Sequence, residues 1–382
     1  MARRIKTTTT TSVVDNTSEV QTLLNAGGTV TLNATRTYLF KSTLSVPTGT
    51  TFDMNNAVCT SEALIAIKAA YTQPHTNTSA SFAVTSGSST FVYSSAGSLS
   101  VGQVVRISGG TSFTSSYFYG WYGKITDITG TTVTLDRASS QTFTATSVRA
   151  YTNPTGIIIK NARLRLTTLK ASGIQLEHVK NSQVLNCEII GNVGDYGVQI
   201  LGIDSNVTGC KIRGFNNNTA YLGYGIWLAG HNLHAASNTI QTCKHCLAAN
   251  YPTFMSTNIN YYNNTLTGGG VPSFPVVDYH ANVIGGTMSG NFISSINDDF
   301  AAVQIRCSNI TATNNVINVN NLSTARWYRV FAIMEGKCDN ITITNNTMEL
   351  YNPNNQVVPP YQITGTLSNN NFVYSGNIFN DN

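Results

Sequence analysis

Short segments in which apolar residues stand two apart, with a variable residue between them, recur through the second half of the chain. This alternation is the period of a β-strand, because successive side chains of a strand point to opposite faces. The clearest examples are 173–176, 197–200 and 225–228, and weaker ones follow at 246–249, 276–279, 302–305 and 330–333. No window from 155 to 380 sustains the i, i+3, i+4 apolar spacing of a helix. The pattern therefore predicts many short strands.

A second motif keeps the same period: a small residue or Asn, then Asn, Cys or Thr, then one residue or none, and then an aliphatic or aromatic residue. It falls at positions 187, 210, 239, 265, 291, 316, 347 and 371. The steps between neighbouring positions are 23, 29, 26, 26, 25, 31 and 24 residues. A nearly constant step indicates one structural unit that is repeated, with insertions confined to a loop. Each unit is expected to hold a few short strands separated by turns.

Strands that recur at this step without helices between them can stack as a parallel β-helix. Equivalent Asn side chains at a tight turn would then hydrogen-bond along the stack as a ladder, and Asn tolerates the left-handed backbone that such a turn needs. We expect Asn238, Asn264 and Asn315 to lie along one edge. The alternative is an antiparallel β-sandwich with Asn-rich turns, but a sandwich has no reason to repeat one motif. The predicted fold class is all-β, a single-stranded parallel β-helix.

The period is broken in the first half of the chain, and this divides it into four predicted parts. Residues 1–12 are a Thr-rich arm, and 13–79 hold an N-terminal cap and the first coils. The cap is a short helix beginning near Ser18, which would shield the open end of the solenoid. Residues 80–152 are a small inserted β-domain, and 153–382 form the main β-helix.

The inserted segment contains a dense aromatic stretch, Tyr117-Phe118-Tyr119-Gly120-Trp121-Tyr122. One interpretation is a small core or a subunit contact. The other is a platform for sugar stacking, because aromatic rings pair with the apolar faces of sugars.

Composition narrows the function classes. Charged residues make up 10% of the chain, against about 25% in average proteins. The apolar fraction of 41% argues against disorder. The net charge of +5 comes without a long Lys/Arg run, so no nucleic-acid partner is indicated. No apolar stretch is long enough to cross a bilayer and no signal peptide is apparent, so membrane insertion is not expected.

The seven cysteines show no disulfide-rich pattern. Cys187 and Cys210 fall at the ladder position, where they are expected to stack as small buried side chains. The His231/His234 pair and the cluster 243–246 superficially resemble a zinc set, but the predicted register places them on different coils. No metal and no cofactor are therefore expected.

The chain from about 13 to 379 resembles the pectate-lyase-like right-handed β-helix of bacteriophage tailspikes. The segments that carry this resemblance are 27–32, 45–50, 101–107, 132–137 and the Asn-ladder coils. The Gly-Asp-Gly-rich opening typical of the family is reduced to Asp15 and Asn16. The resemblance implies a right-handed solenoid in a homotrimer on the virion, outside the bacterial cell. It implies a protein that recognises, and often cleaves, a bacterial capsule, O-antigen or exopolysaccharide, with attachment to the virion through the N-terminal arm.

Strand alternation predicts which side chains face outward. One outward column would hold Gln175, Gln199, Trp227, Ala248, Asp278, Gln304 and Ala332. Two residues further along, a second column would hold Glu177, Leu201, Ala229, Asn250, His280, Arg306 and Met334. Asp278, His280, Gln304 and Arg306 would then form one polar patch on adjacent coils, spaced by ~4.8 Å. Asp298 and Asp299 enter the same region, and Trp227 lies further along as a stacking surface.

Several chemistries are open for this patch. Cleavage of a glycosidic bond needs one protonated and one ionised carboxyl, and Asp278 and Asp299 would lie roughly 10 Å apart, nearer the inverting spacing. Asp298 is a further candidate beside them. A polysaccharide lyase would instead use His280 as the base, with Arg306 neutralising the uronate carboxylate. Binding without cleavage, with Gln304, Arg306 and Trp227 as contacts, and an ordinary polar face are the other possibilities.

Overall fold

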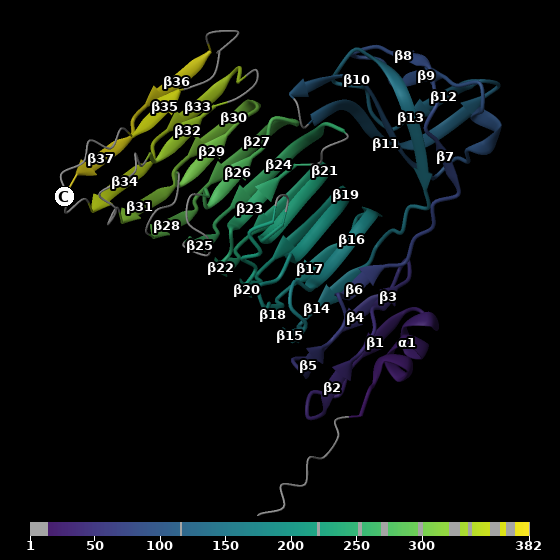
Figure 1. Cartoon of the computed structure of the whole chain (residues 1–382), viewed down its shortest axis with the longest axis horizontal. Coiled ribbons are helices and arrows are strands. Elements are labelled where there is room, and N and C mark those ends of the chain that lie inside the picture. The colour runs from purple at the N-terminus through teal and green to yellow at the C-terminus, as the bar shows by residue number, and fades with distance from the viewer. Residues whose placement is uncertain are drawn as a thin grey trace, which may run out of the picture.

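The computed structural model describes residues 14–114, 117–219, 222–250, 254–268, 274–296, 301–320, 329–334, 338–351, 360–363 and 371–381, with side chains from 110 to 118 and at 296 and 381 left aside. The described chain is a parallel β-helix of about 11 turns, which confirms the predicted fold class. Figure 1 shows the coils stacked in chain order from the N-terminal helix to the C-terminus, with a separate group of strands standing to one side. The sandwich alternative is excluded because the strands of the solenoid pair in parallel.

Each coil contributes strands to three faces. Face 1 consists of β3 (Leu44–Val46), β6 (Ile65–Ala69), β16 (Ser172–Lys180), β23 (His245–Ala249), β26 (Val277–Tyr279), β29 (Val303–Ile305), β32 (Phe331–Ile333) and β35 (Tyr361–Ile363). Face 2 consists of β1 (Thr29–Thr31), β4 (Thr51–Asp53), β14 (Ile158–Lys160), β17 (Gln183–Leu185), β24 (Ser256–Tyr262), β27 (Val283–Ser289), β30 (Ser308–Thr313), β33 (Ile341–Thr344) and β36 (Phe372–Ser375). Two long strands run across both faces, β19 (Tyr196–Thr208) and β21 (Tyr224–Ala236).

Face 3 is an 11-stranded sheet on the remaining side of the solenoid. It consists of β2 (Thr37–Phe40), β5 (Val58–Ser61), β15 (Arg163–Leu166), β18 (Glu188–Ile190), β20 (Lys211–Arg213), β22 (Thr239–Gln241), β25 (Thr265–Thr267), β28 (Phe292–Ile296), β31 (Val316–Asn320), β34 (Thr347–Tyr351) and β37 (Ile378–Asp381). One continuous hydrophobic core fills the space between the faces, because alternate side chains of every strand point inward.

The predicted Asn ladder lies at the turn between faces 2 and 3. The Nδ2 group of Asn238 donates to Oδ1 of Asn264 at 2.9 Å, and the chain of amides continues through later coils. Its members are Asn238, Asn264, Asn291, Asn315, Asn346 and Asn377. The predicted stack of Asn238, Asn264 and Asn315 along one edge is confirmed. In the last coil Asn377 replaces the predicted residue 371. The described ladder Asn side chains up to Asn346 are 1% exposed, so these hydrogen bonds lie inside the protein.

The two ladder cysteines extend this column toward the N-terminus, as predicted. The backbone N–H of Cys187 donates to Sγ of Cys210 at 3.5 Å, and the N–H of Cys210 donates to Oδ1 of Asn238 at 2.9 Å. A second, exposed Asn ladder lies at the corner between faces 1 and 2, where Asn371 donates to Asn340 at 2.8 Å. Asn340 has a φ of 55°, the left-handed conformation expected for such a turn.

The N-terminal helix α1 spans Thr17–Asn25 and packs on β3, where the open end of the solenoid would otherwise be exposed. The helix begins one residue before the predicted Ser18, and Asn16 occupies the N-cap position. The carboxylate of Asp15 accepts the backbone N–H of Thr17 at 2.9 Å and supports the first turn. The predicted arm, residues 1–12, lies outside the described residues.

The chain leaves the solenoid after β6 and returns at β14, which pairs in parallel register with β4. Between them lies a seven-stranded sheet with its own hydrophobic core. Its elements are β7 (His75–Asn77), β8 (Phe82–Val84), β9 (Thr90–Val92), η1 (Ala96–Ser98), β10 (Val104–Thr114), β11 (Tyr117–Thr129), β12 (Thr132–Leu135) and β13 (Phe143–Tyr151). We refer to residues 75–151 as the insert. Its Trp121 lies in this core, 3% exposed, as the core interpretation of the aromatic stretch expected.

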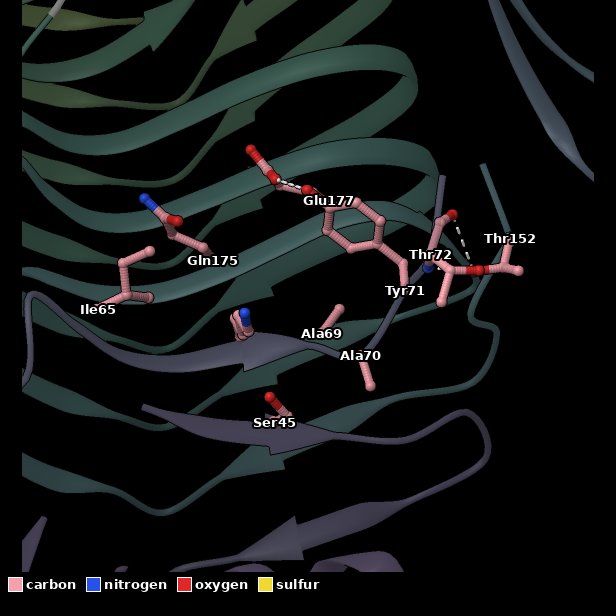
Figure 2. Close-up of a pocket in the computed structure, with 10 residues that line it drawn as sticks. Ser45, Ile65, Ala69, Ala70, Tyr71, Thr72, Thr152, Gln175 and Glu177 are labelled. Atoms are coloured by element: carbon pink, nitrogen blue, oxygen red, sulfur yellow. Dashed lines mark hydrogen bonds between the residues drawn. The ribbon is translucent and has the colours of Figure 1, made fainter. Parts of the chain in front are cut away.

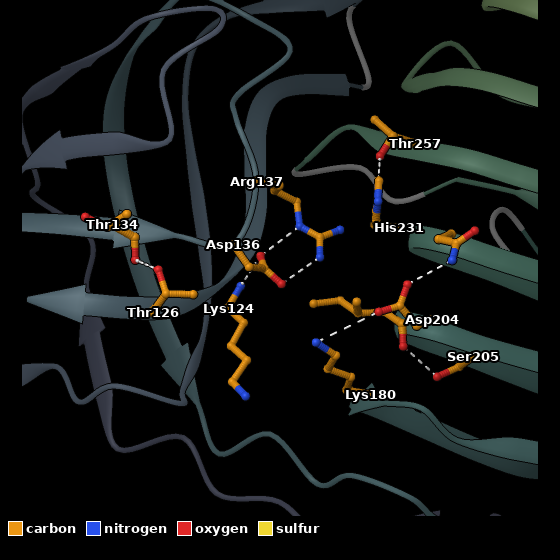
Figure 3. Close-up of polar contacts among 12 residues, drawn as sticks. Lys124, Thr126, Thr134, Asp136, Arg137, Lys180, Asp204, Ser205, His231 and Thr257 are labelled. Atoms are coloured by element: carbon orange, nitrogen blue, oxygen red, sulfur yellow. Dashed lines mark hydrogen bonds and ion pairs between the residues drawn. The ribbon is translucent and has the colours of Figure 1, made fainter.

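Apolar and charged contacts join the insert to the solenoid. Tyr122 of the insert packs with Leu201, Ala229 and Phe254 of the solenoid. Figure 3 shows the ion pair of Asp136 and Arg137, 2.8 Å apart, at the end of β12, facing charged side chains of the solenoid. On the solenoid side lie His231 and the pair of Lys180 and Asp204, whose charged atoms are 3.9 Å apart. Burial, reinforced by the charge of Arg137, lowers the pKa of His231 to about 4, so this histidine is neutral at pH 7.

Candidate functional site

The outward column of face 1 has the register that the sequence predicted. The residues paired in parallel along it are Gln175, Gln199, Trp227, Ala248, Asp278, Gln304 and Ala332. Lys68 and Ser45 extend the column toward the N-terminus, because β6 pairs with both β16 and β3. Side chains on this column are spaced by ~4.8 Å, the distance between neighbouring strands.

Asp278, His280 and Arg306 come together on adjacent coils of face 1, as predicted. Nη2 of Arg306 lies 2.6 Å from Oδ2 of Asp278, and Nε2 of His280 lies 3.0 Å from the same oxygen. Nη2 of Arg306 also donates to Nδ1 of His280 at 2.7 Å. An arginine can only donate, so Nδ1 of His280 accepts and its Nε2–H donates to Asp278. We call these three residues the charge cluster.

The charge cluster holds Asp278 ionised. Burial alone would raise the pKa of Asp278, but the charge of Arg306 and the contacts with His280 outweigh it and keep the pKa well below its usual range. A carboxylate in this state cannot donate a proton near neutral pH. Of the two carboxyl roles in glycosidic cleavage, Asp278 therefore fits the ionised one, not the acid.

The predicted patch is not open to solvent in the described part of the chain. Asp278 is 1% exposed, His280 5% and Gln304 8%. Strand alternation correctly gave the face on which these side chains lie, but it did not predict that they are buried there. On the preceding coil of this face the ring of Phe274 packs against His245, and Nζ of Lys244 lies 4.2 Å from the ring centroid.

The expectation of an open stacking surface at Trp227 is wrong. Trp227 is 6% exposed, and its Nε1–H donates to the carbonyl of Asn250 at 2.8 Å. Tyr196, which is half-buried, stacks on Trp227 with ring centroids 5.0 Å apart. Tyr196, which stands three residues before Gln199 on β19, is therefore a partly accessible aromatic residue beside the column. Asp298 and Asp299 lie outside the described residues.

A cavity of about 540 Å³ opens on face 1 toward the N-terminal end of the column. It is lined by Ser45, Ile65, Lys68, Ala69, Ala70, Tyr71, Thr72, Thr152, Gln175 and Glu177. Figure 2 shows Gln175 and Glu177 on one strand, with Tyr71 reaching over from the segment that leads into the insert. Oη of Tyr71 donates to Oε2 of Glu177 at 2.6 Å. We call this cavity the face 1 pocket.

The face 1 pocket is preorganised by the two segments that enter and leave the insert. The backbone N–H of Thr72 donates to Oγ1 of Thr152 at 2.8 Å, and the N–H of Thr152 donates to the carbonyl of Thr72 at 2.9 Å. The ring of Tyr71 meets Tyr151 and His178 edge-on, with centroids 6.1 and 4.8 Å away. The pocket therefore offers a fixed phenol and carboxylate beside an exposed amine, Lys68.

Sequence reasoning placed Gln175 and Glu177 on the outward columns but selected neither of them. It missed Lys68 and Tyr71, which belong to the coil that the insert interrupts. The alternation Ile65-Ala66-Ile67-Lys68 was the available signal, since it makes Lys68 an outward residue.

The face 1 pocket and the charge cluster are separate sites on one face. Gln175 and Asp278 stand four pairing steps apart on the column, which corresponds to ~19 Å at ~4.8 Å per step. Within the described residues, the lining of the pocket and the charge cluster contain one carboxylate each. Neither therefore holds the pair of carboxyls that glycosidic cleavage requires.

The described part of the chain shows neither a candidate metal site nor a membrane-spanning helix. No group of three or more His, Cys, Asp and Glu side chains there could hold a metal ion. The described residues also include no helix long and apolar enough to span a bilayer.

Comparison with solved structures finds that the fold of this chain is similar to that of phage tailspikes. The chain is similar to the Gp54 tailspike of Acinetobacter baumannii bacteriophage AP22, whose structure contains a capsular saccharide of A. baumannii, with a TM-score of 0.50 and 11% identity over 94% of this chain and 73% of that one. It also matches the tailspike gp49 of Pseudomonas phage LKA1, with a TM-score of 0.46 and 13% identity over 95% of this chain and 74% of that one. No family model and no curated protein sequence matches the chain. At this identity the likeness to the AP22 protein shows a shared fold, the parallel β-helix of phage tailspikes.

Proposed function

We propose that this chain is a phage tail protein that binds a bacterial surface polysaccharide along face 1. The observation that carries the proposal is the face 1 pocket, an open cavity of about 540 Å³ that lies within the ~300–1,000 Å³ range of small-ligand sites. Its polar groups suit a sugar: Lys68 and Gln175 donate hydrogen bonds, Glu177 accepts them, and Tyr71 provides an aromatic face.

The column beyond the pocket supports binding of a polymer. Outward residues at ~4.8 Å intervals can follow a chain of sugar rings laid along the solenoid. Tyr196 lies two pairing steps from Lys68 on the same face, and its ring stacks on Trp227. The AP22 tailspike, which shares the fold, was solved with a capsular saccharide, and this agrees with glycan binding by a solenoid of this kind.

The experiment is a binding panel of purified bacterial capsules, O-antigens and exopolysaccharides, measured with the wild-type protein and with Glu177→Gln and Lys68→Gln. We expect one polysaccharide to bind, and each substitution to weaken its binding by about tenfold, the effect of losing a hydrogen bond to a charged group of roughly 1.5 kcal/mol. Glu349→Gln and Lys41→Gln, at exposed positions away from the pocket, are the matched controls. Equal binding by all five proteins would reject the pocket as the site.

Cleavage of the polysaccharide is the second candidate, and the charge cluster favours it. An ionised Asp278 fits the base or nucleophile of a glycosidase, with Asp299 or Asp298 as the acid. A lyase would use His280 as the base once its Nδ1 is released from Arg306, and Arg306 as the partner of the uronate carboxylate, with Gln304 beside them. Incubation of the bound polysaccharide distinguishes these reactions: new reducing ends alone indicate a hydrolase, reducing ends with unsaturated uronates indicate a lyase, and neither indicates an adhesin.

Assembly belongs to the same proposal. We infer a homotrimer carried on the virion, outside the bacterial cell, with attachment through the N-terminal arm. Low charge and the tailspike resemblance support this inference. Light scattering at micromolar concentration tests it, and a monomer under those conditions would contradict it.

A further inference from the structure

A second cavity, of about 370 Å³, lies where the insert meets the corner between faces 1 and 2. The insert contributes Ser86, Tyr119, Ser140, Gln141 and Thr142. The solenoid contributes Met255, Ala281, Val283, Ile284, Ser308, Asn309 and Asp339. We call it the insert pocket. Neither the columns of face 1 nor the face 1 pocket shares any of these residues.

The lining of the insert pocket is rich in hydroxyl and amide groups and poor in charge. Among its described lining residues, Asp339 is the one with a side chain that is charged at neutral pH. Met255 and Val283 add apolar surface, and Tyr119 adds an aromatic ring. Uncharged donors and acceptors beside apolar surface are what a neutral sugar presents to its site, whereas Asp339 would repel an anionic sugar.

Gln141 provides an observation that points to a ligand. Its Oε1 atom is screened from solvent in this conformation and has no hydrogen-bond partner within the described residues. An unpaired buried acceptor is unfavourable, so turning this side chain into the cavity, where a ligand hydroxyl can donate to Oε1, would recover the lost hydrogen bond. The backbone of Gln141 is fixed, because its N–H donates to Oγ of Ser139 at 3.2 Å and its carbonyl accepts from the same hydroxyl at 2.8 Å.

The remaining insert residues of this pocket are also held in place. The backbone N–H of Ser86 donates to Oγ1 of Thr142 at 3.0 Å, which joins the two loops of the lining. The half-buried ring of Tyr119 stacks on Phe143, with centroids 6.3 Å apart and planes 20° apart. A rigid lining lowers the entropic cost of binding.

We propose that the insert pocket binds one uncharged sugar unit, whose hydroxyls pair with Gln141 and Asp339 and whose apolar face lies against Tyr119 and Met255. This inference rests on the proposed glycan binding and assigns a second contact point to it. It also gives the aromatic stretch of the insert two roles, since Trp121 fills the core of the insert and Tyr119 lines the pocket.

Saturation-transfer NMR of the full chain with single sugars tests the proposal. The probes are methyl N-acetyl-β-glucosaminide and methyl β-galactoside, with glucuronate as the anionic comparison. We expect contacts to at least one neutral sugar and at least tenfold weaker binding of glucuronate. Ser140→Trp, at an exposed position on the rim, should block the pocket, and Gln141→Leu should remove the acceptor at similar size; each should weaken the neutral sugar by at least tenfold.

Thr85→Trp is the matched control, because Thr85 is exposed and adjacent to the rim but does not line the pocket. It should bind as the wild-type protein does. Neutral-sugar binding that survives unchanged in Ser140→Trp and Gln141→Leu, or no contact between the wild-type protein and either neutral sugar, overturns the inference. The proposed function is judged separately, by the polysaccharide panel and the variants of the face 1 pocket.

Discussion

The charge cluster allows a quantitative test of whether Asp278 has a structural role. Asp278 has a side chain 2% exposed and Arg306 one 15% exposed, with their atoms 2.6 Å apart. Replacing one partner of such a buried pair leaves the other charge uncompensated, at a cost of about 3–5 kcal/mol. Asp278→Leu and Arg306→Met should each lower the free energy of unfolding by this amount.

The double variant Asp278→Leu/Arg306→Met removes both charges at similar volume. It should cost much less than the sum of the single changes, because replacing a buried pair by apolar residues is often close to neutral. Urea unfolding of the four proteins at pH 7, followed by tryptophan fluorescence, gives the coupling free energy. We expect at least about 3 kcal/mol. A coupling below about 1 kcal/mol, the value of an exposed pair, would refute the reasoning.

The pH dependence of the stability difference between the wild-type protein and Asp278→Leu is a further check. The pKa of Asp278 is lowered below its usual value of 3.8, so the unfolded state binds the proton more readily than the folded state. The stabilisation by the pair is therefore fully present above the usual value and is lost as the pH falls through the lowered one. The wild-type and Asp278→Leu proteins should differ by a constant amount between pH 5 and 8, and the difference should shrink only in acid.

Three further outcomes follow from buried polar groups. Asn264→Ala removes the acceptor of the Asn238 N–H and the donor to the carbonyl of Ala235, so the free energy of unfolding measured in urea should fall by about 2–6 kcal/mol. Asn264→Cys should cost less, because Cys210 occupies the equivalent place in its own coil. Equal losses in the two variants would contradict the ladder interpretation. Burial, reinforced by the charge of Arg106, lowers the pKa of His178 to about 3. The unfolded state therefore binds a proton that the folded state does not, and the free energy of unfolding should fall by about 1.4 kcal/mol per pH unit as the pH falls from 6.5 toward 3. This contribution should be absent in His178→Asn. All seven cysteines are buried thiols outside any disulfide, so a thiol reagent should label the folded protein far more slowly than the urea-unfolded one. Rapid labelling without urea would disprove this burial.

The fold was predictable because its two signals are local and repeated. Asn in a left-handed turn is a backbone requirement, and Asn186, Asn263 and Asn314 have φ values of 52°, 52° and 55° just before the ladder position. Strand alternation fixes the side of the sheet on which each side chain lies, so the columns were predictable from the same information.

What covers a face is a different kind of information. Strand alternation correctly placed Asp278 and Trp227 on the side of the strand opposite the core, but it does not show whether that side is exposed to solvent. That depends on segments between the strands, such as the one that brings Phe274 onto His245. The pocket residues were harder still, since Lys68 and Gln175 are neighbours only because the insert is looped out between β6 and β16. A short window of sequence gives no information on strand pairing between residues more than a hundred positions apart.

The sizes of the cavities explain why the insert matters for function. A regular solenoid face is flat and repeats at ~4.8 Å, so it offers shallow sites between side chains of successive coils. On face 3 such a site, lined by Lys211, Arg213 and their neighbours, has a volume of about 150 Å³. The face 1 pocket and the insert pocket, at about 540 and 370 Å³, both lie where the insert or its connecting segments meet the coils. In these two cavities the insert and its connecting segments add concave surface to the repeat, and this is why the proposed glycan recognition is assigned to the break in the period.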